Sequence, residues 1–188
     1  MESKTVYFEN TGKLNTDATL KVAKKRADEL GIKHIVVASN SGETALKVLK
    51  LFKGCKVIVV THVTGFIGPD KQEFADESKK LVESKGGIVL TTTHAFAGLS
   101  RAMRNKHDMF LLGDIVSDTL RIFGQGTKVA CEIALMAADS GLVRTDEDVV
   151  CIGGSGRGAD TAAVIRPINT PNFFDLKVKE IICKPWVG

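Results

Sequence analysis

Residues 34–52 read HIVVASNSGETALKVLKLF, and this stretch decides the fold. Its first part, residues 35–39, is mostly apolar and β-branched, which predicts a buried strand. From residue 45 onward the apolar residues recur at helical spacing, with one face formed by Ala45, Val48, Leu49 and Phe52. A strand therefore runs into a helix through the short turn of residues 39–44, SNSGET.

The SNSGET turn has the chemistry of a phosphate site. A helix N-terminus leaves about four backbone N–H groups unpaired and carries a partial positive charge. Gly42 would let an anion approach the backbone, and the hydroxyls of Ser39, Ser41 and Thr44 would add donors. In the alternative interpretation Ser41 only caps the helix and Gly42 only makes a tight turn. The residues of the turn alone leave both interpretations open.

Strand and helix patterns alternate through the rest of the chain. Further buried strands are predicted at residues 56–61, 88–93 and 148–152, with others at 5–8, 162–166 and 178–183. Helices are predicted at 16–30, 71–85 and 114–123, and another after Thr127 that is apolar nearly all round. In the helix of residues 71–85 the inward residues would be Phe74, Leu81 and Val82. This alternation predicts an α/β fold, a three-layer sandwich around a mostly parallel sheet, with residues 1–188 as a single domain.

A glycine-rich loop, GGSGRGADT, follows the strand of residues 148–152. Gly154, Gly156 and Ala159 match the dinucleotide pattern G-x-G-x-x-A, but that fingerprint needs a helix next, and here the β-like AAVIRP follows. We interpret the loop as a backbone-lined anion loop with Arg157 as its charged partner. If its strand neighbours that of residues 35–39, the loop lies beside SNSGET; alternatively, its glycines only turn the chain.

Two other predicted strands end in Thr-His, at Thr61–His62 and Thr93–His94, on the same edge of the sheet. Two histidines without a clear third ligand do not define a metal site, and none is predicted. Glu132 lies inside the apolar helix after Thr127. Its carboxylate is either paired within the core or placed near a ligand.

Composition narrows the class of protein. Of 188 residues, 44% are apolar and 26% charged, and the net charge of +4 is spread over predicted helix faces. Aromatics make up only 6% with no basic–aromatic interleaving, so neither nucleic acid nor a membrane is the expected partner. No signal peptide is visible at the N-terminus. The cysteines form no C-x-x-C and are expected to be reduced thiols of a cytoplasmic protein; they are Cys55, Cys131, Cys151 and Cys183.

Several segments together resemble a known family: YFENTGKLNT, GIKHIVVASNSGETA, VIVVTHVTGF, CEIALMAADSG, and GGSGRGADTA with VIRP. The chain resembles the small stand-alone archaeal and bacterial proteins of the pyruvate kinase C-terminal-domain-like family. Its SNSGET turn is similar to the effector-phosphate loop of the pyruvate kinase C-terminal domain. The resemblance implies a five- or six-stranded, mostly parallel sheet with core order 3-2-1-4-5.

The resemblance also carries functional expectations. It implies no pyruvate kinase activity, because that chemistry lies in a TIM barrel of about 250 residues. It implies bound flavin mononucleotide (FMN), with the phosphate held by residues 39–44 and residues 154–161 beside it. Glu43 stands where the family often has a basic residue, which favours a singly phosphorylated ligand. The candidate ligand-binding residues are Ser39, Asn40, Ser41, Gly42, Glu43, Thr44, Thr61, His62, Thr93, His94, Gly154, Ser155, Gly156, Arg157, Gly158 and Thr161.

Three hypotheses of function follow. The first is a binding protein for a phosphorylated cofactor or metabolite, FMN above all. The second is a small flavin-dependent or phospho-metabolite enzyme, with His62, His94 or Glu132 as acid–base candidates. The third is a regulatory or structural subunit with a vestigial site. The sequence leaves open the reaction and whether the chain forms a homo-oligomer.

Overall fold

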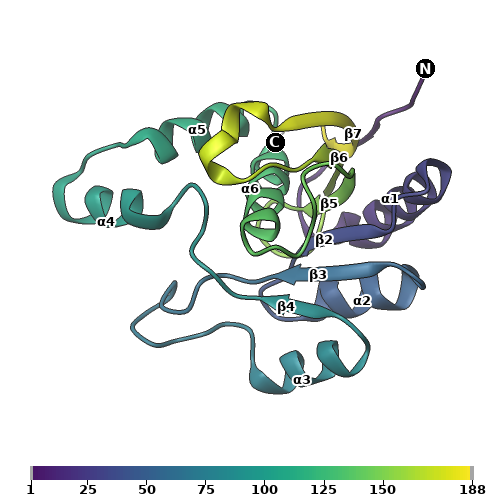
Figure 1. The fold of residues 1–188 in the computed structure, drawn as a ribbon, viewed down its shortest axis with the longest axis horizontal. Helices are drawn as coiled ribbons and strands as arrows, with labels where there is room; N and C mark the ends of the chain where they lie inside the picture. The colour runs from purple at the N-terminus through teal and green to yellow at the C-terminus, as the bar shows by residue number, and fades with distance from the viewer. Residues whose placement is uncertain (1, 187–188) are drawn as a thin grey trace.

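The computed structural model describes residues 2–186 and contains one mixed, mostly parallel sheet of seven strands. The order across the sheet is β1-β7-β6-β5-β2-β3-β4 (Figure 1). The strands are β1 (Val6–Phe8), β2 (His34–Ala38), β3 (Lys56–Val60), β4 (Ile88–Leu90), β5 (Val149–Gly153), β6 (Thr161–Arg166) and β7 (Lys177–Pro185).

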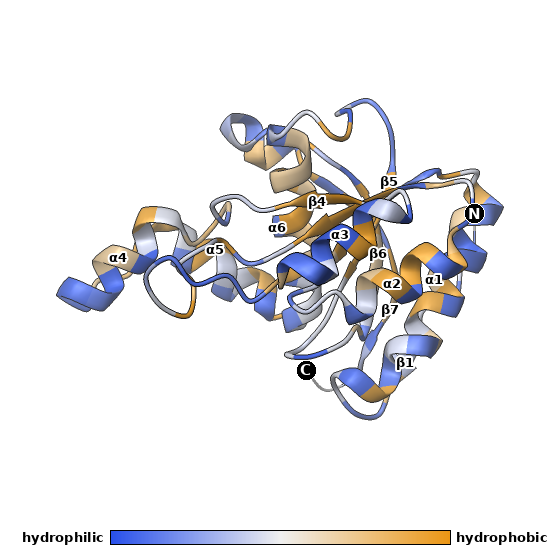
Figure 2. Ribbon diagram, turned by 90° about the horizontal axis from the view of Figure 1, so that it is seen from below, coloured by the Kyte–Doolittle hydropathy of each residue, from blue (hydrophilic) through white to orange (hydrophobic). Residues whose placement is uncertain are grey.

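Helices cover both faces of the sheet, as Figures 1 and 2 show. One face carries α1 (Thr16–Leu30), α2 (Glu43–Leu51) and α3 (Asp76–Ser84). The other carries α6 (Gln125–Asp139), with α4 (Gly98–His107) and α5 (Leu112–Arg121) beyond it. Two short 3-10 turns complete the fold, η1 (Lys13–Asn15) before α1 and η2 (Thr170–Asp175) before β7. The predicted three-layer α/β class is confirmed.

The alternation of strand side chains builds two separate cores. On β2, Ile35 and Val37 pack into the core beneath α1 and α2, whereas Val36 packs into the core beneath α6. Because successive side chains of a strand point to opposite faces, a strand buried on both faces is apolar throughout. This explains why the sheet is made of continuous apolar runs such as HIVVA and KVIVV.

The connection from β5 to β6 sets the strand order. β2, β3, β4 and β5 run parallel, and β5 lies directly beside β2. β6 then returns antiparallel to β5, and β7 antiparallel to β6. The predicted core order 3-2-1-4-5 is thereby confirmed as β4-β3-β2-β5-β6, and β1 and β7 raise the strand number from the expected five or six to seven.

Several local predictions were wrong. The strand predicted at 88–93 ends at Leu90, so Thr93 and His94 lie in the loop after it. The helix predicted at 71–85 begins only at Asp76, because Gln72 is bound into the preceding loop and its side-chain oxygen accepts from the Phe74 N–H. In α3 Val82 is buried, but Leu81 is 44% exposed. The helix predicted to be capped by Thr127 begins at Gln125, after Gly124 with φ 110°.

Asp148, just before β5, ties three strands together through two charged partners. Arg166 Nε donates to one of its oxygens at 2.6 Å and Lys179 Nζ to the other at 2.8 Å. Burial alone would raise the pKa of Asp148, but these two hydrogen bonds outweigh it and keep the pKa below its usual value.

We therefore expect Asp148 to contribute to acid sensitivity. A lowered folded-state pKa means that the ionised group stabilises above the unfolded pKa, and that this stabilisation is lost as pH falls through the folded pKa. Urea denaturation between pH 7 and about pH 3 should give a steeper loss of unfolding free energy for the wild type than for Asp148→Asn. Asp175→Asn, at an exposed carboxylate on η2, should follow the wild-type curve. Parallel curves for wild type and Asp148→Asn would contradict this role.

Candidate ligand site at the carboxyl edge of the sheet

Helix α2 follows the central strand β2 through the SNSGET turn, and the N-terminus of α2 lacks a side-chain cap. The helix begins at Glu43, and the residue before it, Gly42, has φ 89° with no capping hydrogen bond from a side chain. Ser41 is exposed and is not the cap. The first helical bond runs from the Leu46 N–H to the Gly42 carbonyl. The N–H groups of the first turn therefore keep their capacity to bind an anion.

Gly42 is required by its surroundings as well as by its dihedral angle. A Cβ atom there would lie 3.0 Å from the Ser78 Cβ and 3.5 Å from the Phe74 ring, both on or beside α3. That side of the turn is filled by protein. An anion would have to approach α2 from the opposite side, where Lys13 lies.

Three cations surround the carboxylate of Glu43 in the first turn of α2. Lys13 Nζ lies 2.9 Å from it, and this hydrogen bond is the main reason that the Glu43 pKa is lowered. Lys47 and Arg157 lower the same pKa through their charges. Glu43 and Thr44 line one hollow with Gly158 of the glycine-rich loop, so that loop and the SNSGET turn lie side by side, as expected if β5 neighbours β2.

A small hollow lies between the two loops. Its volume of about 10 Å³ has room for roughly one water molecule. The lining residues are Lys13, Thr16, Glu43, Thr44, Lys47 and Gly158. The exposed Lys13–Glu43 ion pair borders it, so a larger ligand would have to displace that pair.

The glycine-rich loop is anchored from within by Asp160, which is fully buried. One Asp160 oxygen accepts from the Gly12 N–H at 2.7 Å and the Ser155 N–H at 3.0 Å, and the other from the Thr161 hydroxyl at 2.8 Å. The loop is thereby fixed against the segment before α1. This explains why a carboxylate follows the glycines, a role that the sequence did not reveal.

The glycines of the loop differ in their surroundings. A Cβ at Gly154 would lie 2.7 Å from the Gly158 carbonyl oxygen, and one at Gly158 would lie 2.5 Å from the Thr16 hydroxyl. Packing therefore requires glycine at both positions. Gly156 has φ 88° with nothing near its missing Cβ, and it is exposed beside Arg157. The part of the loop open to a ligand is residues 156–157.

The ends of β2 and β3 meet in a polar chain. Asn40, from the SNSGET turn, places its amide nitrogen 3.1 Å from His62 Nε2, and His62 Nδ1 lies 2.5 Å from Glu73 Oε2. The chain is satisfied when Nδ1–H donates to Glu73 and Nε2 accepts from Asn40. These two contacts fix the orientation of the His62 ring.

Aromatic rings and a guanidinium cover the same histidine. Phe66 stacks on His62 with ring centroids 3.9 Å apart, and His94 lies 5.3 Å from His62. The guanidinium of Arg101, on α4, lies over the Phe66 ring, 4.0 Å from the ring centroid. These residues form an aromatic cluster of Phe66, His62 and His94 beside the SNSGET turn.

His94, in the loop after β4, and Glu132, on α6, approach this edge. Burial lowers the pKa of His94, helped by the charges of His62, Lys128 and Arg101 and opposed by Glu132. His94 is thus neutral near pH 7, and its Nε2 accepts from the Val63 N–H at 3.3 Å. Glu132 accepts from the Phe96 N–H at 3.1 Å and is paired with Lys128, both groups being buried. Its carboxylate has the internal pairing that the sequence offered as one alternative.

The candidate residues thus fall into two groups. Asn40, Ser41, Glu43, Arg157 and Gly158 gather at the α2 N-terminus, and His62 and His94 lie in the aromatic cluster. Thr93 is exposed in the loop after β4.

Others face inward. Ser39 is buried at the end of β2, Thr61 bonds the Thr91 hydroxyl at 2.7 Å, and Thr161 bonds Asp160. Their side chains have structural surroundings in this fold.

Sequence reasoning missed four charged residues of this edge: Lys13, Lys47, Glu73 and Lys128. Lys47 and Lys128 could have been found, since each lies one helical turn from a carboxylate already singled out, Glu43 or Glu132. Nothing local marks Lys13 or Glu73, which the fold brings in from loops.

Among the described residues, no group of three or more His, Cys, Asp or Glu is arranged to hold a metal ion. In the same range no helix is long and apolar enough to cross a membrane. All four cysteines are free thiols, and burial raises the pKa of Cys131 and of Cys183 to about 12.

The protein is thus an α/β protein in which the N-terminus of α2, surrounded by charged side chains, lies at the carboxyl end of the central strand β2. A family model described as "Pyruvate kinase, alpha/beta domain" matches residues 17–165, and the chain belongs to that family. The resemblance drawn from the sequence is thereby confirmed.

Two solved structures of pyruvate kinase from Cryptosporidium parvum are similar to the chain. Both are 14% identical to it over 81% of its length, with TM-scores of 0.45 and 0.42. The chain spans only 23% and 22% of these two enzymes.

Proposed function

We propose that this protein binds a singly phosphorylated cofactor, FMN above all, with the phosphate at the N-terminus of α2. The observation that carries the proposal is the uncapped first turn of α2 with Lys13, Lys47 and Arg157 around it. Lys13 already pairs with Glu43, and Lys47 pairs with Asp17 at 2.8 Å. Backbone N–H groups beside these exposed lysines and Arg157 still favour an anion. The proposal includes no pyruvate kinase activity.

Glu43 limits the charge of the ligand. Its carboxylate neutralises part of the positive charge around the turn, so the site suits one phosphate group better than a bisphosphate. The Lys13–Glu43 pair is exposed on both sides, and such pairs contribute little to stability. An incoming phosphate would take over Lys13 at little cost.

The aromatic cluster suits the other end of such a ligand. Asn40 belongs to the SNSGET turn and also contacts His62, so the phosphate site and the cluster are adjacent. A planar ring bound here could contact the rings of Phe66 and His62. The Asn40 amide and the His62 imidazole could form hydrogen bonds with its polar groups. A molecule with a phosphate at one end and a flat polar ring at the other matches both parts.

The test is the visible absorption spectrum of freshly purified protein, followed by titration with FMN and riboflavin. We expect a flavin spectrum, or tight binding of added FMN, with FMN favoured over riboflavin by at least about tenfold, the value of one charged hydrogen bond. Heat-denatured protein is the control. Failure to bind either flavin or inorganic phosphate would contradict the proposal.

A second candidate is a small enzyme that acts on such a ligand. The Glu73–His62–Asn40 chain favours it, because a carboxylate that orients a neutral imidazole is the usual arrangement of a general base. His94 and Glu132 are further acid–base candidates on the same side of the sheet edge as His62. Turnover of a bound flavin or phospho-metabolite separates this function from binding alone, and an empty site would favour the third hypothesis, a regulatory or structural subunit.

A further inference from the structure

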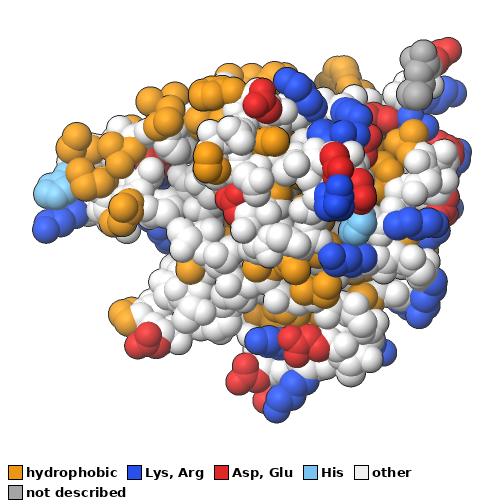
Figure 3. Space-filling view, in the orientation of Figure 1, with side chains coloured by type: hydrophobic (Ala, Val, Ile, Leu, Met, Phe, Trp, Pro, Cys, Tyr) orange, Lys and Arg blue, Asp and Glu red, His pale blue; other side chains and the backbone are white. Residues whose placement is uncertain are grey.

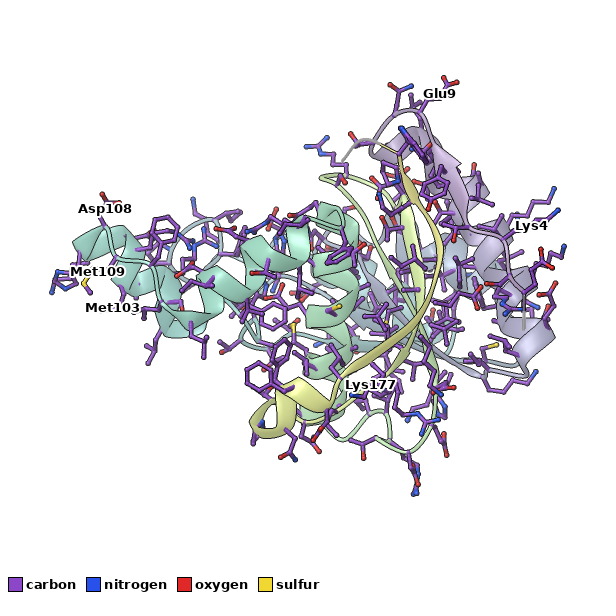
Figure 4. All side chains as sticks on the ribbon, turned by 90° about the horizontal axis from the view of Figure 1, so that it is seen from above. Lys4, Glu9, Met103, Asp108, Met109 and Lys177 are labelled. Carbon is purple, nitrogen blue, oxygen red and sulfur yellow. The ribbon has the colours of Figure 1, made fainter. Side chains whose placement is uncertain are left out.

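Helices α4 and α5 form an arm that projects from the body of the molecule (Figures 1 and 4), with Met103, Asp108 and Met109 at its far end. α4 buries none of its ten residues, and α5 buries only Asp114 and Ser117. Helices of about ten residues are marginal unless an apolar face packs against something. A single copy of the chain provides little such packing for this arm.

α5 has apolar residues on two sides. Val116 and Leu120 pack, half-buried, against the core beneath α6. A second row follows the spacing 3-4-3 along the outer side, at residues 112, 115, 119 and 122. Its apolar members Leu112, Ile115 and Ile122 are 69%, 58% and 78% exposed. Rows with this spacing are the seams along which helices pair.

The exposed apolar surface of the arm is large. Figure 3 shows hydrophobic side chains gathered over α4 and α5. With about 200 Å² for a large apolar residue, the exposed fractions amount to on the order of 900 Å². Typical monomers have patches of about 300–600 Å², and each partner in a standard interface buries about 800 Å². The residues are Leu99, Met109, Phe110, Leu112, Ile115, Ile122 and Phe123.

We propose that the outer side of α5, with the adjoining apolar residues of α4 and its connection, binds the same surface of a second copy of this chain. Two-fold pairing of identical surfaces is the commonest way in which soluble proteins assemble. The area is that of a stable dimer interface. The seam is also bordered by charges that are already compensated within one subunit, so two copies do not repel.

The compensation is visible in two ion pairs. Asp118 and Arg121 pair within α5 at 2.5 Å, and Arg104 of α4 pairs with the buried Asp114. An antiparallel arrangement of the two α5 helices would in addition bring opposite ends of the helix dipoles together.

A lipid surface is the other occupant to consider, and the charges disfavour it. Binding to anionic lipid needs basic side chains free to face the headgroups. On α4, Arg101 lies over the Phe66 ring and Arg104 pairs with Asp114, while Asp118 borders the seam on α5. Free positive charge on the arm is thus confined to Lys106 and His107, in the exposed last turn of α4, and the outer side of α5 has none.

Sedimentation velocity over a range of protein concentrations tests the proposal. The wild type is expected to be a dimer at micromolar concentration. Ile115→Glu and Ile122→Glu each place a charge in the seam and should raise the dimer dissociation constant by about 100-fold. Leu14→Glu is the matched control: Leu14 is 90% exposed, on η1 beside the opposite face of the sheet, and its substitution should leave the dimer intact.

Circular dichroism melts of the same variants confirm that they fold. A wild type that is monomeric at about 100 µM, or folded Ile115→Glu that dimerises like the wild type, would overturn the proposal. Flotation with phosphatidylserine vesicles provides the other outcome. Binding of a monomeric wild type to vesicles, lost in Ile115→Glu, would assign the surface to lipid instead.

Discussion

Asp160→Ala is expected to lower the free energy of unfolding by about 3–5 kcal/mol. The carboxylate is fully buried and accepts from two backbone N–H groups and one hydroxyl. Alanine would leave the buried N–H of Gly12 and the half-buried N–H of Ser155 without that acceptor, and each buried group of this kind costs about 1–3 kcal/mol. Chemical denaturation of the variant measures the loss.

Two further variants separate geometry from charge. Asp160→Asn can keep one oxygen toward the two N–H groups and turn its amide toward the Thr161 hydroxyl, so we expect a smaller loss of about 1–2 kcal/mol. Asp175→Ala removes an exposed carboxylate from η2 and should change little. If Asp160→Ala unfolded at the wild-type denaturant concentration, the link between residue 12 and the glycine-rich loop would carry no stability.

Asp160 illustrates the difference between what the sequence could predict and what it could not. The fold could be predicted, because the apolar runs of strands buried on both faces and the apolar stripes of helices are local sequence patterns. The residues alone gave the pairing of β2 with β5 only as a condition, and the family resemblance supplied it through the order 3-2-1-4-5. The strand pattern AAVIRP after the glycines did exclude the βαβ unit of a dinucleotide site. Asp160 itself has no local signal, because its main partner, Gly12, is 148 residues away.

The same distinction holds for the candidate site. The SNSGET turn and the two Thr-His strand ends lie where parallel strands put their carboxyl ends, so the sequence could predict that they share an edge. The partners that complete them, Lys13 for Glu43 and Glu73 for His62, come from loops with no periodic pattern. Ser39 and Thr161 were candidates as members of the two loops and Thr61 as a strand end, and only the structure reveals their burial.

Combined Ser41→Ala and Thr44→Ala should weaken FMN binding by about 100-fold or more. If the phosphate binds as proposed at the α2 N-terminus, both hydroxyls lie within its reach, since Ser41 is exposed in the turn and Thr44 lines the hollow there. Each hydrogen bond to a charged oxygen contributes about 1.5–3 kcal/mol, and every 1.4 kcal/mol is about tenfold in affinity. Fluorescence titration of the same protein with FMN and with riboflavin measures the effect.

The controls for this double variant use both the ligand and the chain. Riboflavin lacks the phosphate, so its affinity should be unchanged by the two substitutions. Ser84→Ala, at the far end of α3, removes a hydroxyl that bonds only the Leu81 carbonyl and should bind FMN like the wild type. Glu43→Gln should act in the opposite direction and strengthen FMN binding, because it removes a negative charge and releases Lys13. Equal weakening of FMN and riboflavin in the double variant would move the phosphate away from α2, because a loss shared by both ligands cannot come from a group that only one of them carries.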